Sequence, residues 1–324
     1  MAEISIIKLA NRLQTEADAW LMLEELRWGD APVCAHCCSD SVRFVPPTNG
    51  TTRTATGGKQ SARRVWRCHK RGGGCGRQFT VTVGTVMHNT KISLRIWLFV
   101  MFELVASKNG VAAREIERKY EISNKTAWHL LHRLREAMAA DPLVAPIRGR
   151  VVADETYFGP TPANLHADKR KDIPKGGSGH VLSLVNRDTG EVRSTVLPYA
   201  GSAPIEKHMT ENVDLPNTHL ETDSAKVYKQ LGKSAASHAA VDHYRGEYVV
   251  NGAGTNPAEN YFSQLKRSLH GTHHQVSVKH LSRYLGEFDF RFSTRDMSDA
   301  QRMSNMIGSN GFQRPLSWDR LTAE

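Results

Sequence analysis

The segment GRVVADETYFG, residues 149–159, decides the fold, because it predicts a β-strand that places Asp154 after the apolar pair Val151 and Val152. A second strand ends near Asp223, and a later helix contains Glu259, with 35 residues between these two acids. Two strand carboxylates and one helix carboxylate that converge on a sheet can hold two Mg²⁺ or Mn²⁺ ions. Glu155 alternates to the opposite strand face, so it is not assigned to this metal site.

The helix at GTNPAENYFSQLKR, residues 254–267, allows two readings of Glu259. Asn256 is a favoured N-cap and Pro257 suits the first helical position, so Glu259 at the third position predicts a capping box. The alternative is metal binding, and the two roles do not exclude each other. Lys266 lies seven residues after Glu259, so both side chains point within roughly 20° of one direction. This spacing suits a helix that lies on a DNA end.

The elements around these acids predict a mixed α/β layout. VLSLVNRDTGEVRSTVLP, residues 181–198, reads as two alternating strands around an Asp-Thr-Gly turn, which indicates a hairpin. A helix follows at APIEKHMTENV, residues 203–213, and then the strand that ends near Asp223. The order β, β-hairpin, α, β, α, α is typical of an α/β fold.

Charge favours a polyanionic partner. The 324 residues have a formal net charge of +10, and the stretch from Ser41 to Phe102 contains no Asp or Glu. An acid-free, Arg-rich stretch suits phosphate contact, so we expect double-stranded DNA as partner. A basic but unspecialised surface is the alternative, and a lipid surface is less favoured because no amphipathic basic helix is evident there. The candidate DNA contacts are Arg63, Arg64, Arg67, Lys125, His129, Arg133, Lys266 and Arg267.

The sequence predicts a cytoplasmic protein without a membrane partner. Its first twenty residues form a mixed amphipathic pattern and not a secretory signal. The longest apolar run, residues 96–102, is too short to span a bilayer. Five cysteines, an odd number, argue against a disulfide framework in a reducing compartment.

Four of the five cysteines have the spacing of a zinc ribbon. Cys34 and Cys37 form a C-x-x-C pair, and Cys68 and Cys75 form a second, wider pair. Four thiolates from two turns can bind one structural Zn²⁺ tetrahedrally. Three alternatives stay open: His69 as a substitute ligand, Cys38 as a spare or core thiol, and cysteines that are simply buried.

Residues 110–138 predict two helices around a turn at 121–123. Apolar residues have the placement of a helix-turn-helix core, and the side chains expected to face a DNA groove are Lys125, His129, His132 and Arg133. A plain helical hairpin is the alternative, because Glu121 stands near the place where a small turn residue is usual.

Several motifs together resemble bacterial insertion-sequence transposases of the ISXO-like type, over about residues 15–295. The motifs are RW-x₅-CxxC at 27–37, QFTVTVGTVM at 78–87, TAWHLLHRLR at 126–135, DETYFG at 154–159, TDS at 222–224, NPAENYFSQLKR at 256–267 and HLSRYLGEFDFRFSTR at 280–295. The chain departs from the family pattern in the wider second cysteine pair, in an inserted basic loop at 46–64 and in Ser293.

The resemblance implies an RNase H-like catalytic domain with Asp154, Asp223 and Glu259 as metal-binding triad and Lys266 as basic companion. It further implies binding of transposon terminal inverted repeats, hydrolysis at the 3′ ends and joining to target DNA, by homo-oligomers on DNA associated with the bacterial nucleoid. The expected domains are an N-terminal helix (1–28), a zinc ribbon (29–90), a helix-turn-helix region (91–142), the catalytic domain (147–295) and a C-terminal tail (296–324).

Two rival functions use the same residues. A DNA-binding regulator could keep the ribbon and the helix pair while its catalytic domain is idle, although the intact triad argues against this. A stand-alone nuclease of RNase H type would not need sequence-specific DNA ends.

Overall fold

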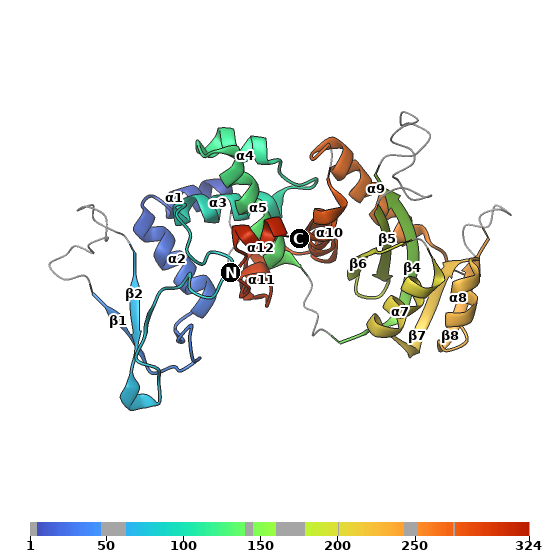
Figure 1. Cartoon of the computed structure of the whole chain (residues 1–324), viewed down its shortest axis with the longest axis horizontal. Coiled ribbons are helices and arrows are strands. Elements are labelled where there is room, and N and C mark those ends of the chain that lie inside the picture. The colour runs from blue at the N-terminus through green and yellow to red at the C-terminus, as the bar shows by residue number, and fades with distance from the viewer. Residues whose placement is uncertain are drawn as a thin grey trace. The chain divides into compact units, whose positions relative to one another are not determined.

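The computed structural model describes residues 5–46, 63–139, 145–159, 179–199, 201–242, 252–274 and 276–323. These residues divide into two compact units, shown in Figure 1. The first comprises the described residues among 1–107, 113–138 and 297–324, and the second those among 108–112 and 139–296. Positions 47–62 of the inserted basic loop, with Arg53 and Lys59, lie outside the described residues.

The second unit is built on a five-stranded mixed sheet. Its strands are β4 (Ile147–Phe158), β5 (Gly179–Asn186), β6 (Val192–Leu197), β7 (Val213–Asp223) and β8 (Ser237–Val241), in the order β6-β5-β4-β7-β8. The pairs β4–β5 and β5–β6 are antiparallel, whereas β4–β7 and β7–β8 are parallel. The predicted hairpin is therefore confirmed, and the mixed sheet is consistent with an RNase H-like domain.

Helices cover both faces of this sheet. On one face, α9 (Asn256–Gly271) and α10 (Val278–Ser293) pack on Val152, Phe158 and neighbouring strand residues. On the other face, α7 (Ser202–Asn212) and α8 (Lys226–Leu231) pack on Val151 and Ala153. Because strand side chains alternate, Asp154 shares the face of α9 and Glu155 shares the face of α8.

A buried polar network fixes α9 and α10 to the sheet. Asp289 of α10 accepts hydrogen bonds from the Ser194 backbone N–H and hydroxyl, both at 2.7 Å, and from the Tyr261 hydroxyl of α9 at 2.5 Å. Asp289 is 6% exposed and Tyr261 is 1% exposed. The network therefore helps to set the position of α9, the helix that contains Glu259.

Stability of the second unit should fall with rising pH through Asp289. Burial raises the pKa of Asp289 from 3.8 to about 7, although its hydrogen bonds act in the opposite direction. Between these values the folded protein keeps a proton that the unfolded chain has released, so stability is present at low pH and is lost as pH rises towards 7. We expect urea unfolding to show that wild type loses roughly 2 kcal/mol more than Asp289→Asn from pH 5 to pH 7, since Asp154 contributes its own loss to both proteins.

The exposed acid Asp296 offers the matched control for this measurement, since its side chain is 89% exposed. Asp296→Asn should leave the pH slope unchanged. Equal slopes for wild type and Asp289→Asn would show that Asp289 ionises in the folded protein as easily as in the unfolded chain.

The first unit begins with two helices where one was expected. The structure has α1 (Ile6–Arg12) and α2 (Glu16–Trp28), so the expectation of one helix at the N-terminus was wrong. Thr15 is the N-cap of α2: its hydroxyl accepts from the Asp18 N–H at 3.2 Å, and the Asp18 carboxylate accepts from the Thr15 N–H at 2.7 Å. This reciprocal capping box ends one helix and starts the next.

The cysteine region forms a small antiparallel sheet. Its strands are β1 (Val42–Val45), β2 (Val65–Cys68) and β3 (Gln78–Phe79), in the order β1-β2-β3, with a short 3₁₀ helix η2 (Lys70–Gly72). Its apolar cluster is small and includes Trp28, Trp66 and Phe79 beside the cysteines. A module with so little buried apolar surface requires another source of stability.

The helical middle consists of α3 (Leu94–Ala106), α4 (Ala113–Tyr120) and α5 (Asn124–Met138). The two helices expected around residues 121–123 are therefore confirmed. Glu121 takes φ +52°, the left-handed region that small turn residues favour. A role of this pair in reading DNA stays a prediction.

The residues beyond Asp296 are not a peripheral tail. They form α11 (Asp299–Gly308) and α12 (Trp318–Ala323), and Met306, Ile307 and Phe312 are fully buried. Apolar side chains at helical spacing within a polar segment explain this packing, since Met303, Met306 and Ile307 form one face of α11. No helix among the described residues is long and apolar enough to cross a membrane.

Candidate functional site

Asp154 lies in an environment that opposes its negative charge. Burial is the largest cause that raises its pKa, to about 7, and the charges of Glu155, Asp223 and Glu259 raise it further. A hydrogen bond from the Glu155 N–H at 2.8 Å acts in the opposite direction. The fields of Asp223 and Glu259 therefore both reach Asp154, although the three residues lie far apart in the sequence.

Asp223 stands on the strand beside Asp154. The parallel ladder pairs Val152 with Glu221, so continuing two residues along both strands brings Asp154 level with Asp223. Asp223 ends β7, and its Oδ1 accepts from the Ala225 N–H at 3.0 Å, which fixes the turn into α8. The strand context expected for both aspartates is confirmed.

Glu155 occupies the opposite face, as alternation predicts. Its carboxylate accepts a short hydrogen bond from the Tyr228 hydroxyl in α8. Burial is also the largest cause that raises the pKa of Glu155. Glu155 therefore has its own partner on the α8 side of the sheet, away from the α9 side.

Glu259 lies in the first turn of α9, but the expected capping box is absent. The N-cap is Thr255 and not Asn256, which moves Glu259 one position beyond the place that reaches back to the cap backbone. Its Oε1 instead accepts from the Thr255 hydroxyl at 2.9 Å. The side chain is exposed, so it is accessible to a ligand at the sheet edge.

Lys266 and Arg267 follow on the exposed surface of α9. The opposite, buried side of this helix is formed by Ala258, Tyr261, Phe262, Leu265 and Leu269. Glu259 and Lys266 therefore share the solvent side, as the seven-residue spacing predicts.

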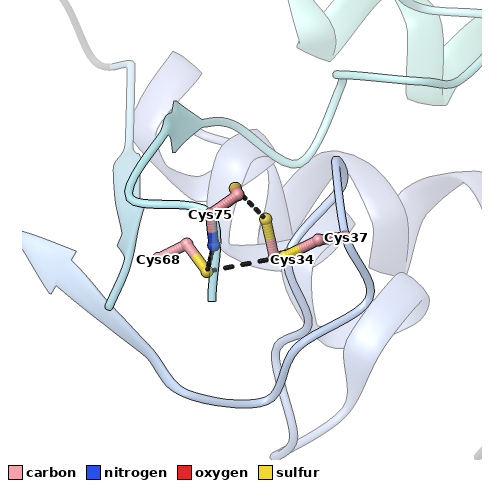
Figure 2. A group of neighbouring side chains, drawn as sticks. All are labelled: Cys34, Cys37, Cys68 and Cys75. Atoms are coloured by element: carbon pink, nitrogen blue, oxygen red, sulfur yellow. Dashed lines mark hydrogen bonds between the residues drawn. The ribbon is translucent and has the colours of Figure 1, made fainter. Parts of the chain in front are cut away.

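Four cysteines of the first unit meet in one cluster, drawn in Figure 2. Cys34 and Cys37 come from the turn before β1, and Cys68 and Cys75 flank η2. Their Sγ atoms all lie within 4.8 Å of one another, and none is in a disulfide. Among the described residues, no other group of metal-ligating side chains is this tight, so the three carboxylates are farther apart.

Distances within the cluster have the values that a tetrahedral zinc site requires. The Sγ atoms of Cys34 and Cys75 are 3.7 Å apart, as are those of Cys37 and Cys68. Four sulfurs at 2.3 Å from one ion would be separated by roughly 3.8 Å. The cluster therefore fits a structural zinc, and Cys75, the ligand made doubtful by the wide spacing, belongs to it. Cys38 is exposed and outside the cluster, with φ +59°.

Two arginines expected to contact DNA have protein partners instead. Arg64 donates to Glu24 at 2.8 Å and lies 4.3 Å from the Phe44 ring centre. Arg133 is 7% exposed, donates to the His88 carbonyl and lies over the Trp97 ring. Their positions indicate structural roles, whereas Arg63 and Arg67 are exposed.

The face of α5 expected to meet a DNA groove is covered in part by the chain's own C-terminal segment. Trp318 lies 4.2 Å from Lys125 Nζ and packs against His129 at 5.4 Å between ring centres. His132 is fully buried beside Trp128. The expectation that His132 and Arg133 face outward was therefore wrong, because both are buried, with Arg133 packed on Trp97 of α3 and His132 on Trp128.

Sequence reasoning also missed Glu221 and Arg187. Glu221 is 4% exposed and lies two residues before Asp223, which places both on one face of β7. It forms ion pairs with Arg187 at 3.3 Å and with Arg150 at 3.5 Å. The period of two from Asp223 could have revealed Glu221, whereas its arginine partners depend on the fold.

Two comparisons place these observations among known proteins. Residues 146–293 match the family model described as the ISXO2-like transposase domain. An uncharacterized protein in transposable element ISH50 of Halobacterium salinarum is 24% identical over 293 residues, which cover 86% of this chain and 90% of that protein. The second similarity extends well beyond the matched domain, into the cysteine and helical regions. Residues 146–293 are thus similar to the ISXO2-like transposase domain, and both matches together support an insertion-sequence transposase.

Proposed function

We propose that this transposase binds transposon terminal inverted repeats, cleaves their 3′ ends and joins them to target DNA by two-metal phosphoryl transfer. The observation behind the proposal is the environment of Asp154, a half-buried carboxylate whose pKa is raised by its burial and by the charges of Asp223 and Glu259. Among the described residues, neither Asp154 nor Asp223 has an ion pair with a cationic side chain. Repelling acids that lack such a partner are typical of a divalent cation site.

The donor set fits Mg²⁺ or Mn²⁺. All three side chains offer carboxylate oxygens, the ligands that these hard ions prefer. Two ions at such a site would lie roughly 3.5–4 Å apart. When bound, such ions stabilise charge on the attacking and leaving oxygens of an in-line phosphoryl displacement.

The residues of the site have different proposed roles in holding the ions and the DNA. Asp154 and Asp223 stand on paired strands of a covered sheet, which holds their backbones rigidly. Glu259 approaches from a helix and is exposed, so its side chain can adjust when ligands enter. Lys266 and Arg267, on the same helix, are placed to contact phosphates of a DNA end.

We further propose that Cys34, Cys37, Cys68 and Cys75 bind one structural Zn²⁺, which stabilises a zinc ribbon within residues 29–90. Exposed cations supply the proposed DNA contacts: Arg63, Arg67 and Lys125 in the first unit, with α4 and α5 as a helix-turn-helix region, and Lys266 and Arg267 in the second. The resemblance to transposases that act as multimers on paired ends supports a homo-oligomer on DNA at the bacterial nucleoid as the proposed active form.

Strand transfer of a labelled terminal-repeat duplex with Mg²⁺ tests the proposal. We expect Asp223→Asn to retain duplex binding and to lose both 3′-end cleavage and transfer. Asp296→Asn, an exposed acid of the same unit, should behave as wild type.

The outcome of the strand-transfer experiment also distinguishes the transposase from the two rival functions. Binding without any cleavage by wild type would favour the DNA-binding regulator. Cleavage of duplexes irrespective of the terminal repeat would favour the stand-alone nuclease. Equal products from wild type and Asp223→Asn would remove Asp223 from the mechanism.

A further inference from the structure

The entrance to α9 is held by side chains from elsewhere in the second unit. Arg187, which follows β5, donates through Nη1 to the Gly252 carbonyl at 2.9 Å and through Nη2 to the Gly254 carbonyl at 3.2 Å. The Gly254 N–H donates to Glu221 Oε2 at 2.8 Å. Three hydrogen bonds therefore fix residues 252–254, directly before the N-cap Thr255.

Glu221 connects this entrance to both strands of the acidic site. It lies in β7, two residues before Asp223 and on the same face. Its Oε1 is 3.5 Å from Nη2 of Arg150, a residue of β4 that lies four positions before Asp154. One buried carboxylate thus lies in the strand of Asp223, contacts Arg150 in the strand of Asp154 and contacts Gly254 directly before the N-cap of the helix of Glu259.

Glu221 differs from the triad acids because its negative charge is compensated by neighbouring arginines. Arg187 Nε and Arg150 Nη2 both lie within ion-pair distance of its carboxylate, so its negative charge is compensated within the protein. Asp154, by contrast, is surrounded by further acids. A carboxylate already neutralised by two guanidinium groups is a poor metal ligand but a good anchor, since Arg holds carbonyl and carboxylate oxygens in a fixed fork.

Thr255 extends the chain of contacts to Glu259. Thr255 is fully buried, and its hydroxyl donates to Glu259 Oε1 at 2.9 Å. A shift of residues 252–254 would therefore move both the start of α9 and the group that orients the Glu259 carboxylate.

We propose that Arg187 and Glu221 are positioning residues that hold the start of α9 so that Glu259 meets Asp154 and Asp223. The inference rests on the proposed metal-dependent function. It assigns to this ion pair a role in the third metal ligand's placement and not in metal binding itself.

The decisive measurement maps the site without relying on activity. Fe²⁺ in place of Mg²⁺, with ascorbate and peroxide, generates radicals that cut the backbone near the bound ion. Wild type should be cut near residues 154, 223 and 259. Arg187→Lys retains the charge but loses the fork, so cutting near residue 259 should fall relative to cutting near 154 and 223.

Strand transfer gives the second readout. We expect Arg187→Lys and Glu221→Gln to lower the transfer rate about 10–100-fold, with an increased Mg²⁺ requirement and unchanged duplex binding. Arg193→Lys is the matched control: Arg193 pairs with Glu191 at 2.7 Å, donates to the Ala145 carbonyl at 2.9 Å and is similarly buried, but these partners lie outside α9. This control should match wild type in both readouts.

The outcomes separate the inference from the function on which it rests. Wild-type cutting near residue 259 in Arg187→Lys would overturn the positioning role. Absence of specific cutting in wild type would instead refute the metal site. Loss of folding in both variants, followed by circular dichroism, would assign the pair to general stability and also overturn the inference.

Discussion

Asp154→Asn is expected to reduce strand transfer by about 10³-fold while making the metal-free protein more stable. Loss of one ligand to a catalytic ion removes several kcal/mol of transition-state stabilisation, and roughly 4 kcal/mol corresponds to this factor. The neutral amide also removes a half-buried negative charge that Asp223 and Glu259 repel. We therefore expect a gain of about 1 kcal/mol, seen as a rise of about 2–4 °C in the Tm of the second unit.

The combination of lost activity and gained stability identifies a functional acid, because a structural acid would lose both. Mg²⁺ should raise the Tm of wild type and leave that of Asp154→Asn unchanged. Asp296→Asn, whose side chain is exposed, should change neither property. A lower Tm for metal-free Asp154→Asn would contradict the idea that this carboxylate is held in an unfavourable environment.

Zinc removal should have the largest effect on the first unit. Metal binding by a small module contributes on the order of 10 kcal/mol to folding, and the apolar cluster beside the four cysteines is small. We expect chelation, or Cys34→Ser, to unfold residues 29–90. Trp28 and Trp66 report the change through tryptophan fluorescence, since their rings pack 5.9 Å apart beside the cluster.

Cys38→Ser is the matched control for this experiment. Cys38 is exposed and one residue from Cys37, but outside the cluster, so its replacement should leave zinc content and fluorescence unchanged. One zinc per chain by elemental analysis in wild type, and none in Cys34→Ser, is the expected result. Native fluorescence after complete zinc removal would show that the cysteines are simply buried core residues.

The sequence by itself determined the strands, the hairpin and the acids of the α/β unit. Its alternation of apolar and polar residues placed Asp154 and Glu155 on opposite faces, which agrees with Val152 packing under α9 and with the hydrogen bond from Tyr228 of α8 to Glu155. The cysteine spacing predicted the four members of the cluster, but His69 and Cys38 stayed open as alternatives until the structure brought the four Sγ atoms together. These features depend on the alternation and spacing of residues that lie close together in the sequence.

Tertiary structure decided the features that depend on contacts between distant residues. The sequence predicted exposed His132 and Arg133, but α12 and the core beside α5 enclose this region. It placed the cap of α9 one residue late, at Asn256, because it did not show how Gly254 and Thr255 are held. The Arg187–Glu221 pair joins residues 34 positions apart, and no periodic pattern encodes such a pair. Such contacts form only when distant segments pack together, so local propensity does not predict them.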